Sequence, residues 1–282
     1  MPLVSIRDEV RKAEAGGYAV PMFLVFDLAS AEGLFQALDE KRSPAMVGVY
    51  ADWVNRACGA ALAAMIRTLA AESTAPVSLA LDHGATLDDC RRAISLGFTD
   101  IMYDGSKLPL AENIAIARRA AEEAHAAGAG LEAELGRVGS GADYGTFGAL
   151  GEGFTDPAAA EQFCAETQVD ILAVAIGNAH GFYRGEPRLD LGRLREIRRR
   201  TPVALSLHGG TGLSNQQFRS AIAEGIAKVN IFTDLAHAAG LKIQDLAKAG
   251  KGSYFDVLGG IRVAFRQRCG HFIDVFGSAG KA

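Results

Sequence analysis

Cysteine is scarce in this chain, and the few cysteines form no motif. There are four of them, without a Cys-x-x-Cys pair: Cys58, Cys90, Cys164 and Cys269. This spacing indicates neither a disulfide framework nor a thiolate zinc cluster. We expect all four thiols to fill core positions, because a free cysteine behaves as a small hydrophobic residue.

Long hydrophobic runs and an excess of positive charge are also missing. No apolar run approaches the roughly 18 residues of a membrane span, and the segment 1–17 carries charges where a signal peptide has an apolar core. The formal net charge is −4, and the basic residues are scattered except at 198–200. We therefore expect a cytoplasmic protein that binds neither nucleic acid nor a membrane. Small-molecule chemistry is the function class that remains.

No linker rich in proline, glycine or serine divides the chain, and no repeat is evident. Its 282 residues are 49% hydrophobic and 22% charged, which is typical of a soluble globular protein with a large core. At about 150 residues per domain the length allows two domains, but α/β barrels use about 250 residues as one unit. We expect a single domain over 1–282, with 250–282 as a C-terminal helical extension.

Short apolar runs alternate with longer amphipathic stretches along the chain, and this alternation predicts a parallel sheet. The expected strands are 18–26, 44–50, 77–83, 101–105, 131–135, 171–177, 203–208 and 226–231. The expected helices are 31–41, 54–72, 87–96, 111–127, 157–167, 189–200, 214–224 and 235–249. Eight βα units, with no Gly-x-Gly-x-x-Gly after the first strand, favour a closed (β/α)8 TIM barrel over an open doubly wound sheet.

Local signals support parts of this assignment. Thr86 and Asp89 form a candidate capping box at the start of one helix, and Gly97 follows its end. The segment 136–155, after the fifth strand, contains seven glycines and no periodicity. Such a long loop in a compact domain is usually functional.

Three of the six histidines lie at the ends of predicted strands: His83, His180 and His208. Barrel enzymes build their sites from the carboxyl ends of the strands, so these side chains are expected to meet. Three imidazoles with one open position are a common catalytic zinc site, which makes zinc the expected cofactor. The alternative for each is a buried, hydrogen-bonded histidine or a general base.

Two carboxylates belong to the same expected site. Asp82 precedes a proposed ligand and could exchange a proton with a substrate hydroxyl, or it could fix an imidazole tautomer. Glu132 lies on the predicted fifth strand, on the same face as Glu134. It is a candidate further metal contact, with an internal ion pair as the alternative.

A glycine-rich turn after the seventh strand forms a candidate anion site. Glycine lets peptide N–H groups approach an oxyanion, and barrel phosphate sites usually follow strands seven and eight. At the end of strand eight, Asn230 and Thr233 would complete the site. The turn itself consists of Gly209, Gly210, Thr211 and Gly212.

At this point the sequence resembles the class II, zinc-dependent ketose-bisphosphate aldolases. The similar segments are GYAVP (17–21), LALDHGATLDD (79–89), GFTDIMYDGSKLPLAENI (97–114), LEAELGRVG (131–139), DILAVAIGNAHGFY (170–183), LSLHGGTGL (205–213) and GIAKVNIFTDL (225–235). The resemblance implies a barrel and an aldolase that makes or cleaves a ketose 1-phosphate or 1,6-bisphosphate, giving dihydroxyacetone phosphate and an aldehyde through a zinc-stabilised enediolate. It also implies a homodimer or homotetramer.

The resemblance further implies roles for single residues. The zinc ligands would be His83, His180 and His208, and Asp82 would act in proton transfer at the C4 oxygen. The phosphate of dihydroxyacetone phosphate, sometimes with a monovalent cation nearby, would be held by Gly181, Gly209, Thr211, Asn230 and Thr233.

Three departures from the family pattern matter for mechanism and specificity. Where the family loop has a glutamate assigned to the C3 proton, this chain has Ala142, so Asp143 is the hypothesised base and Glu152 a more distant candidate. The segment 23–27 replaces polar groups by apolar ones, and the family's arginine for the distal phosphate is missing near 258–260, although Arg262 and Arg266 could substitute. These changes indicate an aldehyde other than glyceraldehyde 3-phosphate.

Three alternatives stay open. A zinc hydrolase or lyase fits the three histidines, although the glycine-rich turn argues against it. A non-catalytic phosphosugar-binding homologue or assisting subunit would explain Ala142 and Leu24. A lysine aldolase would need a lysine in an apolar strand, for which Lys228 is the nearest candidate.

Overall fold

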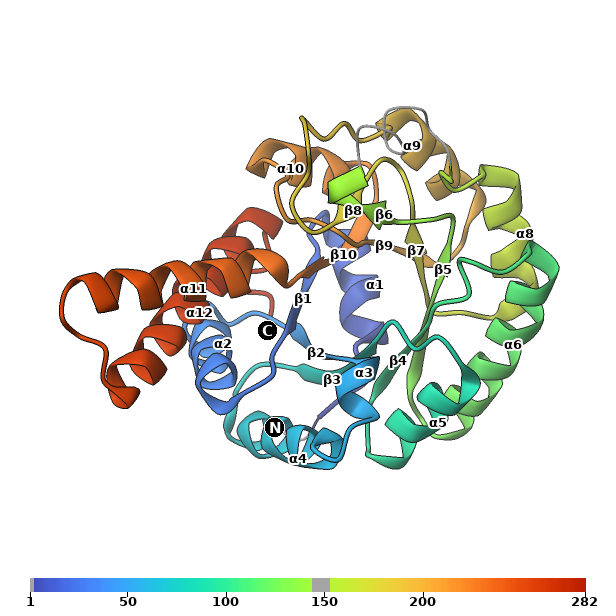
Figure 1. The fold of residues 1–282 in the computed structure, drawn as a ribbon. Helices are drawn as coiled ribbons and strands as arrows, with labels where there is room; N and C mark the ends of the chain where they lie inside the picture. The colour runs from blue at the N-terminus through green and yellow to red at the C-terminus, as the bar shows by residue number, and fades with distance from the viewer. Residues whose placement is uncertain (1–2, 144–152) are drawn as a thin grey trace.

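The computed structural model describes residues 3–143 and 153–282, and its core is a closed barrel of eight parallel strands (Figure 1). The strands are β1 (Val20–Leu24), β2 (Ala45–Tyr50), β3 (Val77–Asp82), β4 (Asp100–Tyr103), β5 (Gly130–Leu135), β7 (Ile171–Val174), β9 (Ala204–Leu207) and β10 (Ile226–Ile231). They follow one another around the barrel as β1-β10-β9-β7-β5-β4-β3-β2. The predicted (β/α)8 barrel is confirmed.

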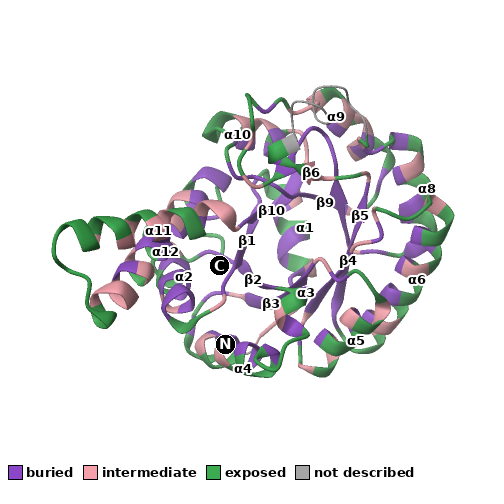
Figure 2. Cartoon of the chain, in the orientation of Figure 1, coloured by how far each residue is buried: buried purple, intermediate pink, exposed green. Residues whose placement is uncertain are grey.

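Helices surround the barrel, with buried faces toward the strands and exposed faces in solvent (Figure 2). They are α1 (Arg7–Gly16), α2 (Leu28–Lys41), α3 (Ala51–Val54), α4 (Gly59–Glu72), α5 (Leu87–Ser95), α6 (Leu110–Ala126), α8 (Pro157–Thr167), α9 (Leu191–Arg200), α10 (Asn215–Ala223), α11 (Thr233–Lys248) and α12 (Tyr254–Phe276). The capping box of Thr86 and Asp89 begins α5 as predicted. No helix among the described residues is both long enough and apolar enough to span a bilayer.

Some predicted boundaries are wrong, and side-chain hydrogen bonds explain one of them. The strand expected over 171–177 ends at Val174. Beyond it, the Asn178 side chain accepts a hydrogen bond from the Ile176 N–H and donates one to the Val174 carbonyl. Because these bonds replace ladder hydrogen bonds, the chain turns there toward His180.

The helix expected over 54–72 is two helices, α3 and α4, separated by a tight turn. A Cβ atom at Gly59 would lie 2.2 Å from the Val54 carbonyl oxygen, so this close approach requires glycine. Cys58 lies in the turn and is exposed, which corrects the expectation of a core position, whereas the other three cysteines are buried.

Helix α1 was not predicted, and it closes the amino-terminal end of the barrel. Its buried residues Val10 and Ala13, with Ile6 just before the helix, join a cluster of interior side chains from the strands. In Figure 1 this helix is seen through the centre of the barrel. The interior is therefore a packed core that opens only at the carboxyl ends of the strands.

The C-terminal segment consists mainly of α12, which packs against α2 and α11. Its Phe265, Phe272 and Phe276 are buried in the main core, so the expected extension is part of the domain's packing. Helices α11 and α12 run side by side away from the barrel, and the loop that joins them lies far from the strands (Figure 1).

Two short strands lie at the open end of the barrel: β6 (Gly139–Ser140) and β8 (Ala179–His180). They pair in parallel, with Ser140 beside His180. This pairing joins the start of the glycine-rich loop to the candidate site. The residues of that loop from 144 to 152 lie outside the described part of the chain.

Candidate active site

A cavity of about 800 Å³ opens at the carboxyl ends of the strands. It receives side chains from the predicted site and from segments far apart in the chain. Its lining consists of Leu24, Phe26, Tyr50, Trp53, Asp82, His83, Ala85, Asp104, Ser106, Lys107, Glu134, residues 137–140, His180, Gly181, residues 208–211, Asn230, Phe232 and Thr233.

The three predicted histidines meet in this cavity. His83 follows β3, His180 lies on β8 and His208 follows β9, and each offers a ring nitrogen such that the three atoms lie within 4.8 Å of one another. His83 Nε2 and His208 Nδ1 are 3.1 Å apart. Three imidazole nitrogens converging on one point, open to a cavity, fit the donor set of a catalytic zinc site.

Carboxylates orient two of these rings through their outer nitrogens. His83 Nδ1 lies 2.9 Å from Asp104 Oδ2, and His208 Nε2 lies 2.8 Å from Glu132 Oε1. Because a neutral imidazole donates through only one nitrogen, each carboxylate leaves the other nitrogen free to bind a cation. His83 is also held with a φ of 51°, a strained conformation for a non-glycine residue.

The electrostatics of the group favour a cation. Burial opposes the charged form of His83, but Asp82, Asp104 and Glu134 outweigh it and raise the pKa of His83 to about 9. The pKa of His180 falls to about 3, because its ring is desolvated and close to the other two histidines. The carboxylates around His83 thus favour positive charge at this point of the cavity, and a bound metal ion would supply it.

Glu132 contributes no oxygen to the group of three histidine nitrogens among the described residues. Its Oε2 lies 2.7 Å from Lys228 Nζ, and both side chains are buried. Burial opposes ionisation of Glu132, but Lys228 and His208 hold the pKa of this carboxyl well below its usual range. The internal ion pair, the alternative for this residue, is what the structure shows.

The same ion pair bears on the lysine-aldolase alternative. Lys228 is fully buried and does not line the cavity. Its ammonium group also bonds Asn230 Oδ1 at 2.5 Å and Ser206 Oγ at 3.3 Å. A Schiff base requires an amine that a ketone can reach, and the Lys228 amine does not line the cavity.

Asp82 ends β3 and lines the cavity beside the histidines. Its Oδ1 accepts a hydrogen bond of 3.1 Å from Asn230 Nδ2 and lies 4.0 Å from His83 Nε2. Asn230 thereby holds one carboxylate oxygen of Asp82, and the Asp82 side chain lines the cavity. This position suits a group that exchanges a proton with substrate.

The glycine-rich turn also lines the cavity, but only in part. Gly209, Gly210 and Thr211 face it together with Gly181 and Thr233, whereas Gly212 lies against Tyr183 outside it. Gly209 has a φ of 66°, and a Cβ atom there would lie 2.3 Å from the Ala179 carbonyl oxygen. The turn therefore depends on glycine for its close approach to β8.

Asp143 is placed at the end of a short 3-10 turn, Gly141–Asp143, which directly follows β6. In the same turn, the Ala142 N–H donates to Ser140 Oγ at 3.2 Å. Glu152, the more distant candidate for the same role, lies outside the described residues.

The structure adds residues that sequence reasoning did not assign. Asp104 and Glu134 form a second group with His83, whose ligand atoms also lie within 4.8 Å. Glu134 Oε2 is buried without a hydrogen-bond partner, and burial together with the charge of Asp104 raises the pKa of Glu134 to about 8. Asp104 directly follows β4 and Glu134 is the penultimate residue of β5, and these positions at strand ends could have indicated a role. Three aromatic residues also line the cavity without a pattern that indicated a role: Tyr50 ends β2, Trp53 lies in α3 and Phe232 directly follows β10.

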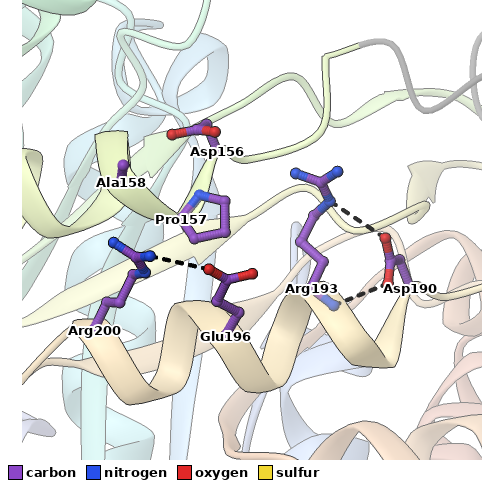
Figure 3. Close-up of a pocket in the computed structure, with 7 residues that line it drawn as sticks. All are labelled: Asp156, Pro157, Ala158, Asp190, Arg193, Glu196 and Arg200. Carbon is purple, nitrogen blue, oxygen red and sulfur yellow. Dashed lines mark hydrogen bonds and ion pairs between the residues drawn. The ribbon is translucent and has the colours of Figure 1, made fainter.

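A separate hollow of about 410 Å³ lies on the surface between α8 and α9 (Figure 3). Four of its five charged residues pair with one another: Arg193 Nε lies 3.3 Å from Asp190, and Arg200 lies 3.1 Å from Glu196. The fifth, Asp156, accepts a hydrogen bond from the Ala159 N–H at the start of α8. This pairing leaves the hollow without converging groups for chemistry, in contrast to the cavity of the barrel.

Comparisons with known proteins agree with this geometry. A family model of class-II fructose-bisphosphate aldolase matches residues 4–281. A fructose-bisphosphate aldolase of Geobacillus stearothermophilus is 35% identical over 290 residues, covering 100% of this chain and 99% of the relative. A 6-phospho-5-dehydro-2-deoxy-D-gluconate aldolase of Halalkalibacterium halodurans is 39% identical over 241 residues, 84% of this chain and 83% of the relative.

A solved structure gives the same result for the fold. The YdjI aldolase of Escherichia coli K12 superposes with a TM-score of 0.89 at 32% identity, covering 99% of each chain. The match therefore extends over the whole barrel and its helices. Because sequence, fold and family model agree over nearly the entire length, this chain belongs to the class-II fructose-bisphosphate aldolase family, whose members are carbon–carbon lyases.

Proposed function

We propose that this chain is a zinc-dependent aldolase that joins dihydroxyacetone phosphate to an aldehyde, or cleaves the resulting ketose phosphate. The observation that carries the proposal is the convergence of three histidine nitrogens beside Asp82 in a cavity that also contains a glycine-rich turn. A hydrolase of a neutral substrate has no need for such a turn.

The zinc ion would be held by His83, His180 and His208, and carboxylates on their outer nitrogens orient His83 and His208 for binding. When bound, zinc supplies Lewis acidity toward the ketone oxygen of the substrate. The carboxylate of Asp104, which lies 2.9 Å from His83 Nδ1, would offset part of the charge of the ion.

The protein's own groups would move the protons. In the direction of synthesis, Asp143 takes the proton from C3 of dihydroxyacetone phosphate, and the electron pair left on that carbon forms the new bond to the aldehyde carbon. The aldehyde oxygen then receives a proton from Asp82, which Asn230 holds in position. In the direction of cleavage the same steps run in reverse.

The phosphate would bind at the glycine-rich side of the cavity. Gly181, Gly209 and Gly210 offer backbone close to the cavity, with Thr211, Asn230 and Thr233 around them. Backbone N–H groups that point at an anion bind it without a bulky side chain in the way. A monovalent cation beside the phosphate is part of the proposal.

The aldehyde partner would differ from glyceraldehyde 3-phosphate. The two arginines that could replace the family's missing one are paired elsewhere: Arg262 lies 3.3 Å from Glu32, and Arg266 lies 2.9 Å from Glu40. The named relative that acts on 6-phospho-5-dehydro-2-deoxy-D-gluconate supports a phosphosugar substrate other than fructose bisphosphate. We also propose that the enzyme is cytoplasmic and works as a homodimer or homotetramer.

Metal analysis and proton exchange test the proposal. The purified chain should bind about one zinc per subunit, and His83→Ala, His180→Ala and His208→Ala should each lose it. Unchanged zinc content in any of these variants would refute that ligand.

The second readout follows the C3 proton in deuterated solvent. The zinc-loaded enzyme should exchange this proton of dihydroxyacetone phosphate. Asp143→Ala should abolish exchange without loss of zinc, and Asp82→Ala should impair cleavage more than exchange. Exchange at the original rate in Asp143→Ala would move the role to Glu152. No exchange in the unmodified enzyme, with binding demonstrated, would favour a non-catalytic phosphosugar-binding protein.

A further inference from the structure

One side of the cavity is apolar, and the proposed chemistry does not use it. This surface, which we call the aromatic wall, consists of Leu24, Phe26, Tyr50, Trp53 and Phe232. Its residues come from the ends of β1, β2 and β10, three strands that are neighbours in the barrel. The wall is therefore a continuous part of the mouth of the barrel.

The rings of the wall fix one another. Phe26 packs against Trp53 and against Phe232, with ring centroids 5.0 Å and 4.9 Å apart. The guanidinium of Arg56 lies over the Trp53 ring, 4.5 Å from its centroid. Because Trp53 is held in this way, it offers a rigid apolar surface to a ligand.

The wall lies next to the group that would protonate the aldehyde oxygen. Tyr50 pairs in register with Asp82 across β2 and β3, and its ring centroid is 6.3 Å from that of His83. An aldehyde whose oxygen reaches Asp82 therefore has its carbonyl carbon at the edge of the wall. With the phosphate on the glycine-rich side, the rest of the aldehyde extends over the aromatic rings.

The charge around the wall is unfavourable for a phosphate. Asp82 pairs in register with Tyr50, and both Asp82 and Asp104 line the same cavity as the wall. The cations that line the cavity, Lys107 and Arg137, follow β4 and β5, and β5 lies on the far side of the barrel from β1. Arg56, the cation that stacks on Trp53, does not line the cavity, so a dianion on the cavity side of the wall would meet apolar rings and carboxylates.

We propose that the aromatic wall is the acceptor subsite of this enzyme and that it selects an uncharged aldehyde with an apolar tail over a phosphorylated aldehyde. The inference rests on the proposed aldolase function and names the class of its second substrate. Burial of hydrocarbon against Trp53 and Phe26 would supply the preference.

The test compares three aldehydes with dihydroxyacetone phosphate and the zinc-loaded enzyme. We expect kcat/KM to rise from glyceraldehyde 3-phosphate through glyceraldehyde to 3-phenylpropanal, with on the order of tenfold or more between the two ends. The proton-exchange assay on dihydroxyacetone phosphate alone is run first. If exchange fails, the aldolase function itself is wrong; if exchange occurs and glyceraldehyde 3-phosphate is the best acceptor, only the acceptor proposal is overturned.

Variants of the aromatic wall then test whether the wall causes the preference for the apolar aldehyde. Trp53→Ala should raise KM for 3-phenylpropanal by on the order of tenfold or more and leave the exchange rate unchanged, whereas Trp53→Phe should retain most of the preference. Tyr50→Ser, at a residue that is 40% exposed and tolerates polarity, repeats the test if Trp53→Ala folds poorly. Leu28→Ala is the matched control, because Leu28 lies only two residues after Phe26 of the wall but is exposed and does not line the cavity. Equal losses with all three aldehydes would contradict a role in selection.

Discussion

Glu132 and Lys228 show at the scale of single residues how a buried charge supports a neighbouring site. The pair is fully enclosed, and the same carboxylate orients His208 through its Nε2 atom. A buried ion pair stabilises a fold little in comparison with apolar packing, but removal of one partner leaves the other uncompensated. The ion pair serves here to orient His208, a proposed zinc ligand.

This arrangement predicts the effect of separating the pair. Glu132→Gln should lower the unfolding free energy by about 3–5 kcal/mol and weaken zinc binding by about 10–100-fold, because Lys228 loses its counter-charge and His208 its carboxylate. Thermal melting and metal titration measure the two effects. The double variant Glu132→Gln, Lys228→Met should recover stability but not zinc affinity; additive losses of stability would show that the two side chains are not coupled.

Gly181 and Gly209 separate a binding role from a folding role within the phosphate region. Around Gly181, which has a φ of 80°, nothing lies within 4 Å of an added Cβ, whereas at Gly209 the Cβ would meet the backbone of Ala179. Gly181→Ala should therefore fold, with about 1 kcal/mol of strain, and bind dihydroxyacetone phosphate at least tenfold more weakly, roughly the loss of one good contact. Gly209→Ala should instead destabilise the chain. Calorimetric titration of Gly181→Ala with dihydroxyacetone phosphate measures this affinity, and an unchanged affinity would place the phosphate elsewhere.

At the scale of the element, helix α1 depends on a partner distant in sequence. No side chain near its own start caps it; instead the Ile6 N–H donates to Asp100 Oδ2, 94 residues away, at 3.0 Å. Ser5 Oγ donates to the other oxygen of the same carboxyl. Asp100 begins β4, so this contact ties the helix to the closed end of the barrel.

The position of Asp100 predicts a pH dependence of stability. Burial, partly offset by the hydrogen bond from Ile6, raises the pKa of Asp100 to about 7, from 3.8 when unfolded. Because the pKa is raised in the folded state, the contribution of Asp100 to the unfolding free energy is complete below about pH 4. That contribution is lost as the pH rises through about 7. The unfolding free energy of the original chain should fall between pH 4 and pH 7 relative to that of Asp100→Asn, by on the order of a few kcal/mol. Denaturant titrations of both proteins at each pH measure the difference, and parallel pH profiles would contradict the raised pKa.

At the scale of the whole molecule, the paired helices α11 and α12 carry exposed aromatic residues away from the barrel. Tyr254 and Phe255, at the start of α12, are 71% and 80% exposed, and Leu241 on α11 is 47% exposed. Large apolar side chains gathered on a projecting element are typical of a protein interface. They support the proposed homo-oligomer, with a second copy of the chain as the partner.

Measurements of mass in solution test this surface. Light scattering should give a mass of at least twice 29.6 kDa for the original chain. The variant Tyr254→Ser, Phe255→Ser should shift the mass toward the monomer, because it removes apolar area from the interface. Leu108→Ser, at an exposed residue far from α12 in the chain, serves as the control and should leave the mass unchanged. A monomeric original chain would exclude the oligomer.

Local patterns in the sequence were sufficient for the barrel and for the meeting of the three histidines. Alternating periodicity predicted eight βα units, and parallel strands that close on themselves bring all their carboxyl ends to one mouth. His83, His180 and His208 therefore had to approach one another once the fold was correct. Contacts between residues near in sequence, such as the capping box of Thr86 and Asp89, were predictable for the same reason.

Contacts between distant segments were decided only by the tertiary structure. The sequence left Glu132 between a metal contact and an ion pair, because only the closed barrel sets its distance to Lys228. Helix α1 escaped prediction because its N–H partner, Asp100, is supplied by another strand. The aromatic wall likewise joins Trp53 and Phe232, which no local pattern connects. Periodicity reports which face of an element is buried, whereas the identity of the neighbour depends on how the whole chain closes around it.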